Sequence, residues 1–184
     1  MRRLVLAAAA LFLISVAAQA QEEYPRLEIF GGYAYFNSDQ FDLQRESLNT
    51  PAFIVSAAGN VTKNFGLVGE INGNYGDVTI PNPGPTREFA TNTYTFLFGP
   101  RLTARRTGVN IFGHVLFGGA RTSVDTFDSE TDFAMAVGGG LDINASEKIA
   151  VRLVQADYVP IFASDDTAHN FRISFGVVFR FGPK

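Results

Sequence analysis

The segment from Asn170 to Phe181 places the strongest constraint on what this chain can fold into. Its sequence is NFRISFGVVFRF. One face of the segment is wholly apolar, and it consists of Phe171, Ile173, Phe175, Val177, Phe179 and Phe181. The other face includes Arg172 and Arg180. Because side chains alternate along a β-strand, the pattern predicts a strand with one strongly apolar face. A membrane-spanning barrel turns such a face to lipid and its polar face to the lumen.

The same segment resembles the C-terminal assembly signal of outer-membrane barrels. In that signal a polar residue and a glycine precede two aromatic residues. Here these positions are occupied by Ser174, Gly176, Phe179 and Phe181. The resemblance implies that the barrel assembly machinery is a partner of this chain.

The N-terminal residues have the pattern of a secretory signal peptide. Arg2 and Arg3 precede an apolar run from Leu4 to Ala18, and Ala18-Gln19-Ala20 forms a small-x-small cleavage site. We therefore predict a signal peptide at 1–20 and one barrel domain at 21–184. An uncleaved anchor is the alternative, but the apolar run is short for a span of about 20 residues. The chain has no cysteine, which argues against a disulfide-stapled secreted domain.

Seven more segments show strand patterning, and turn-forming residues separate them. The expected strands are 26–37, 52–62, 67–75, 91–103, 109–121, 132–143 and 148–158, followed by 170–181. Short connections alternate with longer ones of about ten to fifteen residues, as in outer-membrane barrels with short periplasmic turns and long extracellular loops.

These features together resemble the small eight-stranded outer-membrane barrels related to the transmembrane domain of outer membrane protein A. The Phe30-Gly31-Gly32-Tyr33 opening, the regular hairpins and the closing strand carry the resemblance. It implies an all-β, eight-stranded antiparallel up-and-down transmembrane β-barrel in the cell outer membrane, in contact with outer-membrane lipid. We expect no peptidoglycan-binding domain of the kind that larger relatives carry. With a net charge of -3 and no basic patch, nucleic acid is not an expected partner.

Charged side chains on the less apolar strand faces are expected to line the lumen. They are Glu28, Glu70, Arg101, Asp142, Arg172 and Arg180. Side chains fill so narrow a barrel, and buried charges must be paired. We therefore predict an internal ion-pair network that closes the lumen. The alternative is that this network gates slow ion passage.

The strand at 148–158 is ambiguous in its facing. Lipid exposure of Gln155 and Asp157 would cost about 2 kcal/mol or more near the midplane. We therefore expect both to point inward and Asp157 to join the network. Arg152 would then extend along the surface to the periplasmic rim. A β-bulge would reverse this assignment.

Catalytic and metal sites are not expected. In lipid A deacylase barrels a His and a Ser lie two residues apart, whereas His114 is followed by Leu116 and His169 by Phe171. We predict no enzyme activity and no cofactor. The acids between the later strands match no defined metal-binding loop, so no metal is predicted; they are Asp125, Asp128, Glu130, Asp132, Asp165 and Asp166.

The sequence favours a structural or surface-interaction role in the outer membrane. Envelope integrity and binding of an extracellular ligand by the long loops are the functions expected. A pore for ions or small solutes is the main alternative. A soluble ligand-binding barrel of the lipocalin type would have an apolar interior and a polar exterior, which fits Arg172 and Arg180 poorly.

Overall fold

The computed structural model describes residues 24–38, 48–80, 87–124, 130–163 and 167–182. These residues form eight β-strands. The strands are β1 (Leu27–Ser38), β2 (Leu48–Asn60), β3 (Phe65–Ile80), β4 (Arg87–Arg105), β5 (Val109–Val124), β6 (Glu130–Asn144), β7 (Ile149–Phe162) and β8 (Thr167–Phe181). All eight expected strands are therefore present.

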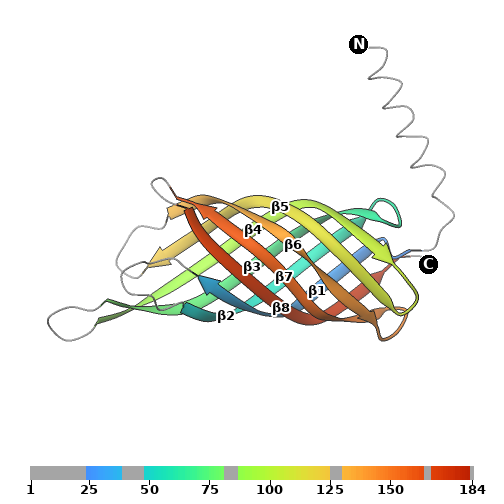
Figure 1. Ribbon diagram of the computed structural model, residues 1–184, viewed down its shortest axis with the longest axis horizontal. Helices are drawn as coiled ribbons and strands as arrows, with labels where there is room; N and C mark the ends of the chain where they lie inside the picture. Colours follow the sequence, from blue (N-terminus) through green and yellow to red (C-terminus); the bar gives the residue numbers. More distant parts are fainter. Residues whose placement is uncertain (1–23, 39–47, 81–86, 125–129, 164–166, 183–184) are drawn as a thin grey trace, which may run out of the picture.

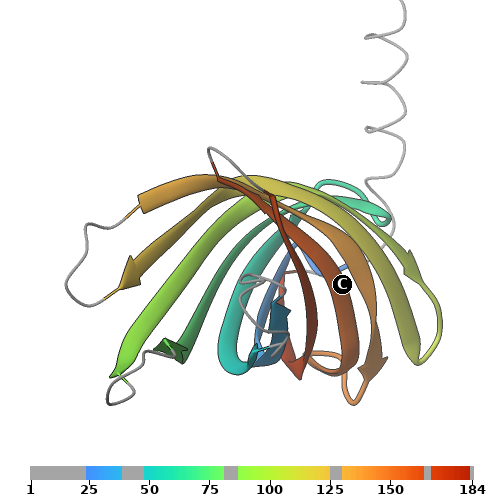
Figure 2. The ribbon, with the colours of Figure 1, turned by 60° about the vertical axis from the view of Figure 1, so that its left-hand side comes forward.

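The strands form one closed antiparallel barrel in chain order (Figure 1). Each strand pairs with its neighbour in sequence, and β1 pairs with β8 to close the sheet. At this seam Leu27 lies opposite Phe181 and Gly32 lies opposite Gly176. The predicted fold class is confirmed. Figure 2 shows the strands tilted across the wall and curving around a common axis.

The two ends of the barrel differ. Three short turns, at 61–64, 106–108 and 145–148, lie at the same end as the start of β1 and the finish of β8. We call this the turn end and the opposite one the far end. The turn at 106–108 requires Gly108, whose φ of 82° lies in the left-handed region.

Strand pairing extends further toward the far end than the sequence predicted. The strands β3 and β4 were expected at 67–75 and 91–103, but their ladder continues to Ile80 opposite Arg87. The connections at this end are only 39–47, 81–86, 125–129 and 163–166, so the expected length of ten to fifteen residues was wrong. Backbone hydrogen bonds continue where the apolar alternation stops, because pairing does not require a lipid-facing side.

The barrel wall separates an apolar outside from an inside that holds polar and charged side chains as well as apolar ones. The exposed residues of β8 are Phe171, Ile173, Phe175, Val177, Phe179 and Phe181, and the buried ones include Arg172 and Arg180. Such a continuous apolar exterior is the surface that a membrane barrel presents to lipid. It is the inverse of the soluble ligand-binding barrel considered above.

Apolar side chains also pack inside the wall. One buried cluster includes Phe36, Leu97, Leu116 and Val159, and a second includes Phe30, Ile54 and Val178. Charged residues lie among these clusters and form the candidate site. None of the described residues belongs to a helix that is long and apolar enough to span a membrane.

Candidate functional site: a luminal ion-pair network

The network begins near the turn end, where one carboxylate serves three guanidinium groups. Arg105 donates to both oxygens of Glu28, at 3.1 and 3.2 Å. Arg180 Nε donates to Glu28 Oε1 at 3.2 Å, and Arg101 Nη2 lies 3.2 Å from Oε2. The Arg101 contact is an ion pair without a hydrogen bond, and the Asn60 amide donates to Oε2 at 3.2 Å. The carboxylate of Glu28 is buried, so these donors replace the water it has lost.

A second ion pair joins β6 to β7. Arg152 donates to both oxygens of Asp142, from Nε at 2.8 Å and from Nη2 at 3.2 Å. Its guanidinium also lies over two aromatic rings, 4.1 Å from the centroid of Phe30 and 4.2 Å from that of Phe112. Because Arg101 Nη2 lies 3.9 Å from Asp142 Oδ2, this pair is continuous with the Glu28 group.

Arg172 is the centre of the third group. It is completely buried and contacts two carboxylates, donating to Glu70 on β3 and to Asp157 on β7. Gln155 donates to Asp157 Oδ2 at 2.8 Å and to Glu70 Oε2 at 3.3 Å, and it accepts from Arg152 Nη1 at 2.6 Å. The three groups are thus one chain of contacts that begins at the turn end.

The β7 strand places both Arg152 and Gln155 inside because it contains a bulge. Pairing with β8 shifts register between these two residues, and Leu153 and Val154 between them are both exposed. The expectation that Arg152 reaches the periplasmic rim was wrong: its side chain is buried against Asp142. An arginine left on the apolar exterior would have lacked this carboxylate partner, and the extra residue of the bulge avoids that outcome.

The structure places every residue named for the network inside the barrel and brings all of them into contact. It adds five that were not predicted to belong to the network, although Gln155 was expected to point inward; they are Asn60, Arg105, His114, Arg152 and Gln155. Arg105 lies four residues after Arg101 and therefore on the same face of the strand. Extending the expected strand by two residues would have identified it. Asn60 likewise lies on the inward face of β2.

The two histidines occupy different environments. His114 is buried, and its Nε2 lies 2.8 Å from Asp157 Oδ1, so the imidazole belongs to the network. His169 lies on the outside, where its Nδ1 hydrogen-bonds to the Tyr158 hydroxyl and its ring stacks on the tyrosine at 5.9 Å between centroids.

The residues of the expected assembly signal lie on both faces of β8. The Ser174 side chain is buried in the lumen, whereas Phe179 and Phe181 are exposed on the lipid-facing side. Gly176 packs against the β1 backbone, and a Cβ there would overlap the Gly31 carbonyl oxygen. The close approach of β1 and β8 is therefore sufficient to require a glycine at this position, independently of any assembly signal.

The acidic residues considered for a metal site fall largely outside the described residues, as Asp125, Asp128, Asp165 and Asp166 do. Within the part of the chain that the structure describes, no group of three or more potential ligands gathers to hold a metal ion. The predicted signal peptide at 1–20 also lies outside the described residues.

A family model for the outer membrane protein beta-barrel domain matches residues 6–181. The chain belongs to this family. No curated protein matches the sequence. The chain is therefore a bacterial outer-membrane barrel, and its apolar exterior is the surface in contact with lipid.

Solved structures share the fold of this outer-membrane barrel at low sequence identity. Neisserial surface protein A is 12% identical with a TM-score of 0.66, covering 88% of this chain and 100% of that one. OprG from Pseudomonas aeruginosa is 10% identical with a TM-score of 0.63, covering 87% and 97%. Ail of Yersinia pestis, in complex with the heparin analogue sucrose octasulfate, is 15% identical with a TM-score of 0.53, covering 86% and 100%.

Outer-membrane barrels keep short turns on the periplasmic side and longer connections outside the cell. The turn end of this barrel is accordingly assigned to the periplasm and the far end to the cell exterior. The Glu28 group thus lies near the periplasmic mouth.

Proposed function

We propose that this protein is a structural and surface-interaction barrel whose lumen is closed by the ion-pair network. The observation that carries the proposal is the unbroken chain of contacts from Glu28 to Arg172. Its members come from β1, β3, β4, β6, β7 and β8, and the convergence of side chains from these strands supports a closed section. A barrel with a closed lumen does not transport solutes through its interior. Loop-mediated binding and envelope integrity are then the roles that this architecture supports.

Conductance in planar bilayers tests the closed lumen. The refolded protein, shown to be folded by a heat-modifiability gel, is expected to give no steady single-channel current. Arg121→Gln, which removes a charge from an exposed position of β5 outside the network, is the control for variants of the network in this assay. A steady current through the unmodified barrel would overturn the closed lumen.

A gated pore is the second candidate, and several luminal polar atoms favour it. Among the described residues, Asn72 Oδ1, Thr95 Oγ1, Ser174 Oγ and Arg172 Nη1 are buried without a hydrogen-bond partner in the protein. Buried polar groups take water as a partner when protein offers none. Water in the lumen beside Arg172 would leave the ion pairs as the barrier to ion flow. In that case Glu70→Gln would raise conductance in the assay above, whereas Arg121→Gln would not.

Recognition is proposed to lie on the extracellular connections. By sequence these connections are rich in acids, including Asp125, Asp128, Asp165 and Asp166. The Ail structure holds a sulfated, strongly anionic ligand, but charge complementarity here favours a cationic partner. Binding to basic peptides is expected to exceed binding to heparin at low salt, and the reverse order would contradict this assignment.

Export and assembly are proposed to follow the two terminal signals. Cleavage after Ala20 would make Gln21 the first residue of the protein purified from outer membranes, which N-terminal sequencing checks. For the assembly signal, Phe181→Ala is expected to reduce assembly in cells while leaving refolding in detergent nearly unchanged. The exposed side chain of Phe133 on β6 provides the control, Phe133→Ala. Equal assembly of both variants would refute a specific role for Phe181.

A further inference from the structure

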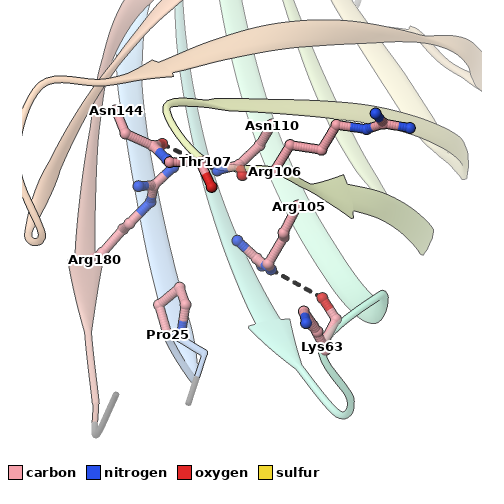
Figure 3. Close-up of a pocket in the computed structure, with 8 residues that line it drawn as sticks. All are labelled: Pro25, Lys63, Arg105, Arg106, Thr107, Asn110, Asn144 and Arg180. Atoms are coloured by element: carbon pink, nitrogen blue, oxygen red, sulfur yellow. Dashed lines mark hydrogen bonds between the residues drawn. The ribbon is translucent and has the colours of Figure 1, made fainter. Parts of the chain in front are cut away.

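The periplasmic mouth contains a hollow lined by cations. Its volume is about 700 Å³, and four of its lining residues are Lys63, Arg105, Arg106 and Arg180. The others are Pro25, Thr107, Asn110 and Asn144. Figure 3 shows Arg105 and Arg180 on two sides of the hollow, whereas the Arg106 side chain extends away from them at its edge. The lining residues come from the start of the barrel, from all three short turns or their flanking strands, and from β8.

The hollow has an excess of positive charge. Among the residues that the structure describes, no acidic side chain lines it, and its Arg105 and Arg180 both contact the carboxylate of Glu28. That single charge is shared among Arg101, Arg105 and Arg180, so it cannot neutralise them. Arg106 is exposed, and its side chain makes no ion pair within the described part of the chain. The field in this concave mouth therefore favours an anion.

The donors at this mouth match phosphate oxygens. Arg105 and Arg180 already donate to Glu28, so each offers phosphate only its remaining N–H groups. A guanidinium that makes no ion pair with the described residues, such as that of Arg106, can bind phosphate in a bidentate fork, and Lys63 adds a point charge. The side chains of Asn110 and Asn144 lie side by side, 3.2 Å apart, and give the mouth a polar wall. A volume of about 700 Å³ lies within the usual range of small-molecule sites and far exceeds a single phosphate.

We propose that the periplasmic mouth of this barrel binds an anion that carries several phosphate groups. Arg105 and Arg180 hold it from the inner side of the hollow, while Arg106 and Lys63 hold it from the turns. The site is separate from the extracellular connections and does not depend on whether the lumen conducts.

Calorimetric titration of the refolded protein with tripolyphosphate tests the site. The barrel is held in nanodiscs of zwitterionic phosphatidylcholine. Arg106→Gln is the decisive variant, because its side chain lies outside the buried network and its loss leaves the fold intact. Loss of a charge-assisted contact is expected to weaken binding about tenfold. Arg26→Gln removes an equal charge from the same end but outside the hollow, and it should change affinity less than about twofold, since exposed charges are screened.

A second arm distinguishes soluble phosphates from lipid headgroups. In nanodiscs that contain phosphatidylglycerol, weaker tripolyphosphate binding would support the site and identify an anionic headgroup as its occupant. Unchanged binding would support the site with a soluble occupant. The proposal is overturned if tripolyphosphate does not bind, or if Arg106→Gln and Arg26→Gln affect its affinity equally.

Discussion

Arg172 shows how a full positive charge is accommodated inside a narrow barrel. It has no exposed surface, and two carboxylates from opposite parts of the chain, Glu70 and Asp157, contact its guanidinium. Moving such groups out of water costs several kcal/mol per ion, so the mutual contacts chiefly offset that cost. The arrangement makes each member depend on the others: removing one leaves an uncompensated charge.

Arg172→Met is expected to destabilise the barrel by about 3–5 kcal/mol, because Glu70 and Asp157 would stay buried and lose their partner. Equilibrium urea unfolding of the refolded protein measures the change. The triple variant Arg172→Met, Glu70→Gln, Asp157→Asn removes all three charges and should recover much of the loss. A triple variant that is less stable than Arg172→Met would contradict this account.

Alternation along the strands was sufficient to predict which charged residues face the lumen, but not which of them pair. Glu28 and Arg101 could be assigned to the inside from parity alone. Their contact depends on strand tilt and on the register of β1 through β4, which no local pattern encodes. Arg152 was assigned wrongly because parity fails after a bulge, and the two apolar residues Leu153 and Val154 are the only sequence trace of it.

At the scale of the strand, the bulge in β7 lets its polar side chains face the lumen while its apolar side chains face lipid. Four buried polar or charged side chains face inward from β6 and β7, namely Asp142, Arg152, Gln155 and Asp157. A regular strand cannot point Arg152 and Gln155 to the same side. The register shift between these residues places Leu153 and Val154 together on the lipid side.

The bulge predicts equal sensitivity at two adjacent positions. Leu153→Arg and Val154→Arg should each destabilise the barrel by about 2 kcal/mol in bilayers, since both positions face lipid. Unfolding in phosphatidylcholine vesicles measures each variant separately. In a regular strand one of the two would face the lumen, so a cost at only one position would argue against the bulge.

The neighbouring strand β6 packs closely on β7 at Gly138 and Gly140. A Cβ at Gly138 would overlap the Ala156 carbonyl oxygen and the Asp157 carboxylate, whereas a Cβ at Gly31 on β1 would meet nothing within 4 Å. Gly138→Ala should therefore cost about 1–3 kcal/mol through overpacking. The matched control, Gly31→Ala, should be neutral or slightly stabilising. Differential urea unfolding compares them, and equal effects would contradict the close packing of β6 on β7.

At the scale of the molecule, closure joins the two ends of the chain. β1 pairs with β8 along its length, and Gly182 lies against Arg26. The start of β1 and the end of β8 are therefore neighbours at the turn end. Nothing in the ladder requires the chain to begin at β1, because each strand pairs with two neighbours around the ring.

A circular permutant should consequently fold. Joining residue 182 to residue 26 by a short linker and opening the turn at 106–108 retains all eight ladders and the ion pairs. The product is expected to show the heat-modifiable gel shift of the folded barrel. Opening the chain inside β5, next to the buried Leu116, is the control and should abolish the shift. Failure of the first permutant alongside a folded parent would contradict this view of the seam.

The seam between β1 and β8 also dictates when the protein can finish folding. Glu28 and Arg180 lie 152 residues apart in sequence, yet they are partners. The first strand made therefore keeps an unpaired edge until the last one has been synthesised and exported. During that interval the outward faces of all strands are apolar and surrounded by water. Such a chain aggregates unless something holds it, so its passage across the periplasm calls for a chaperone that binds the unfolded form and releases it only at the membrane.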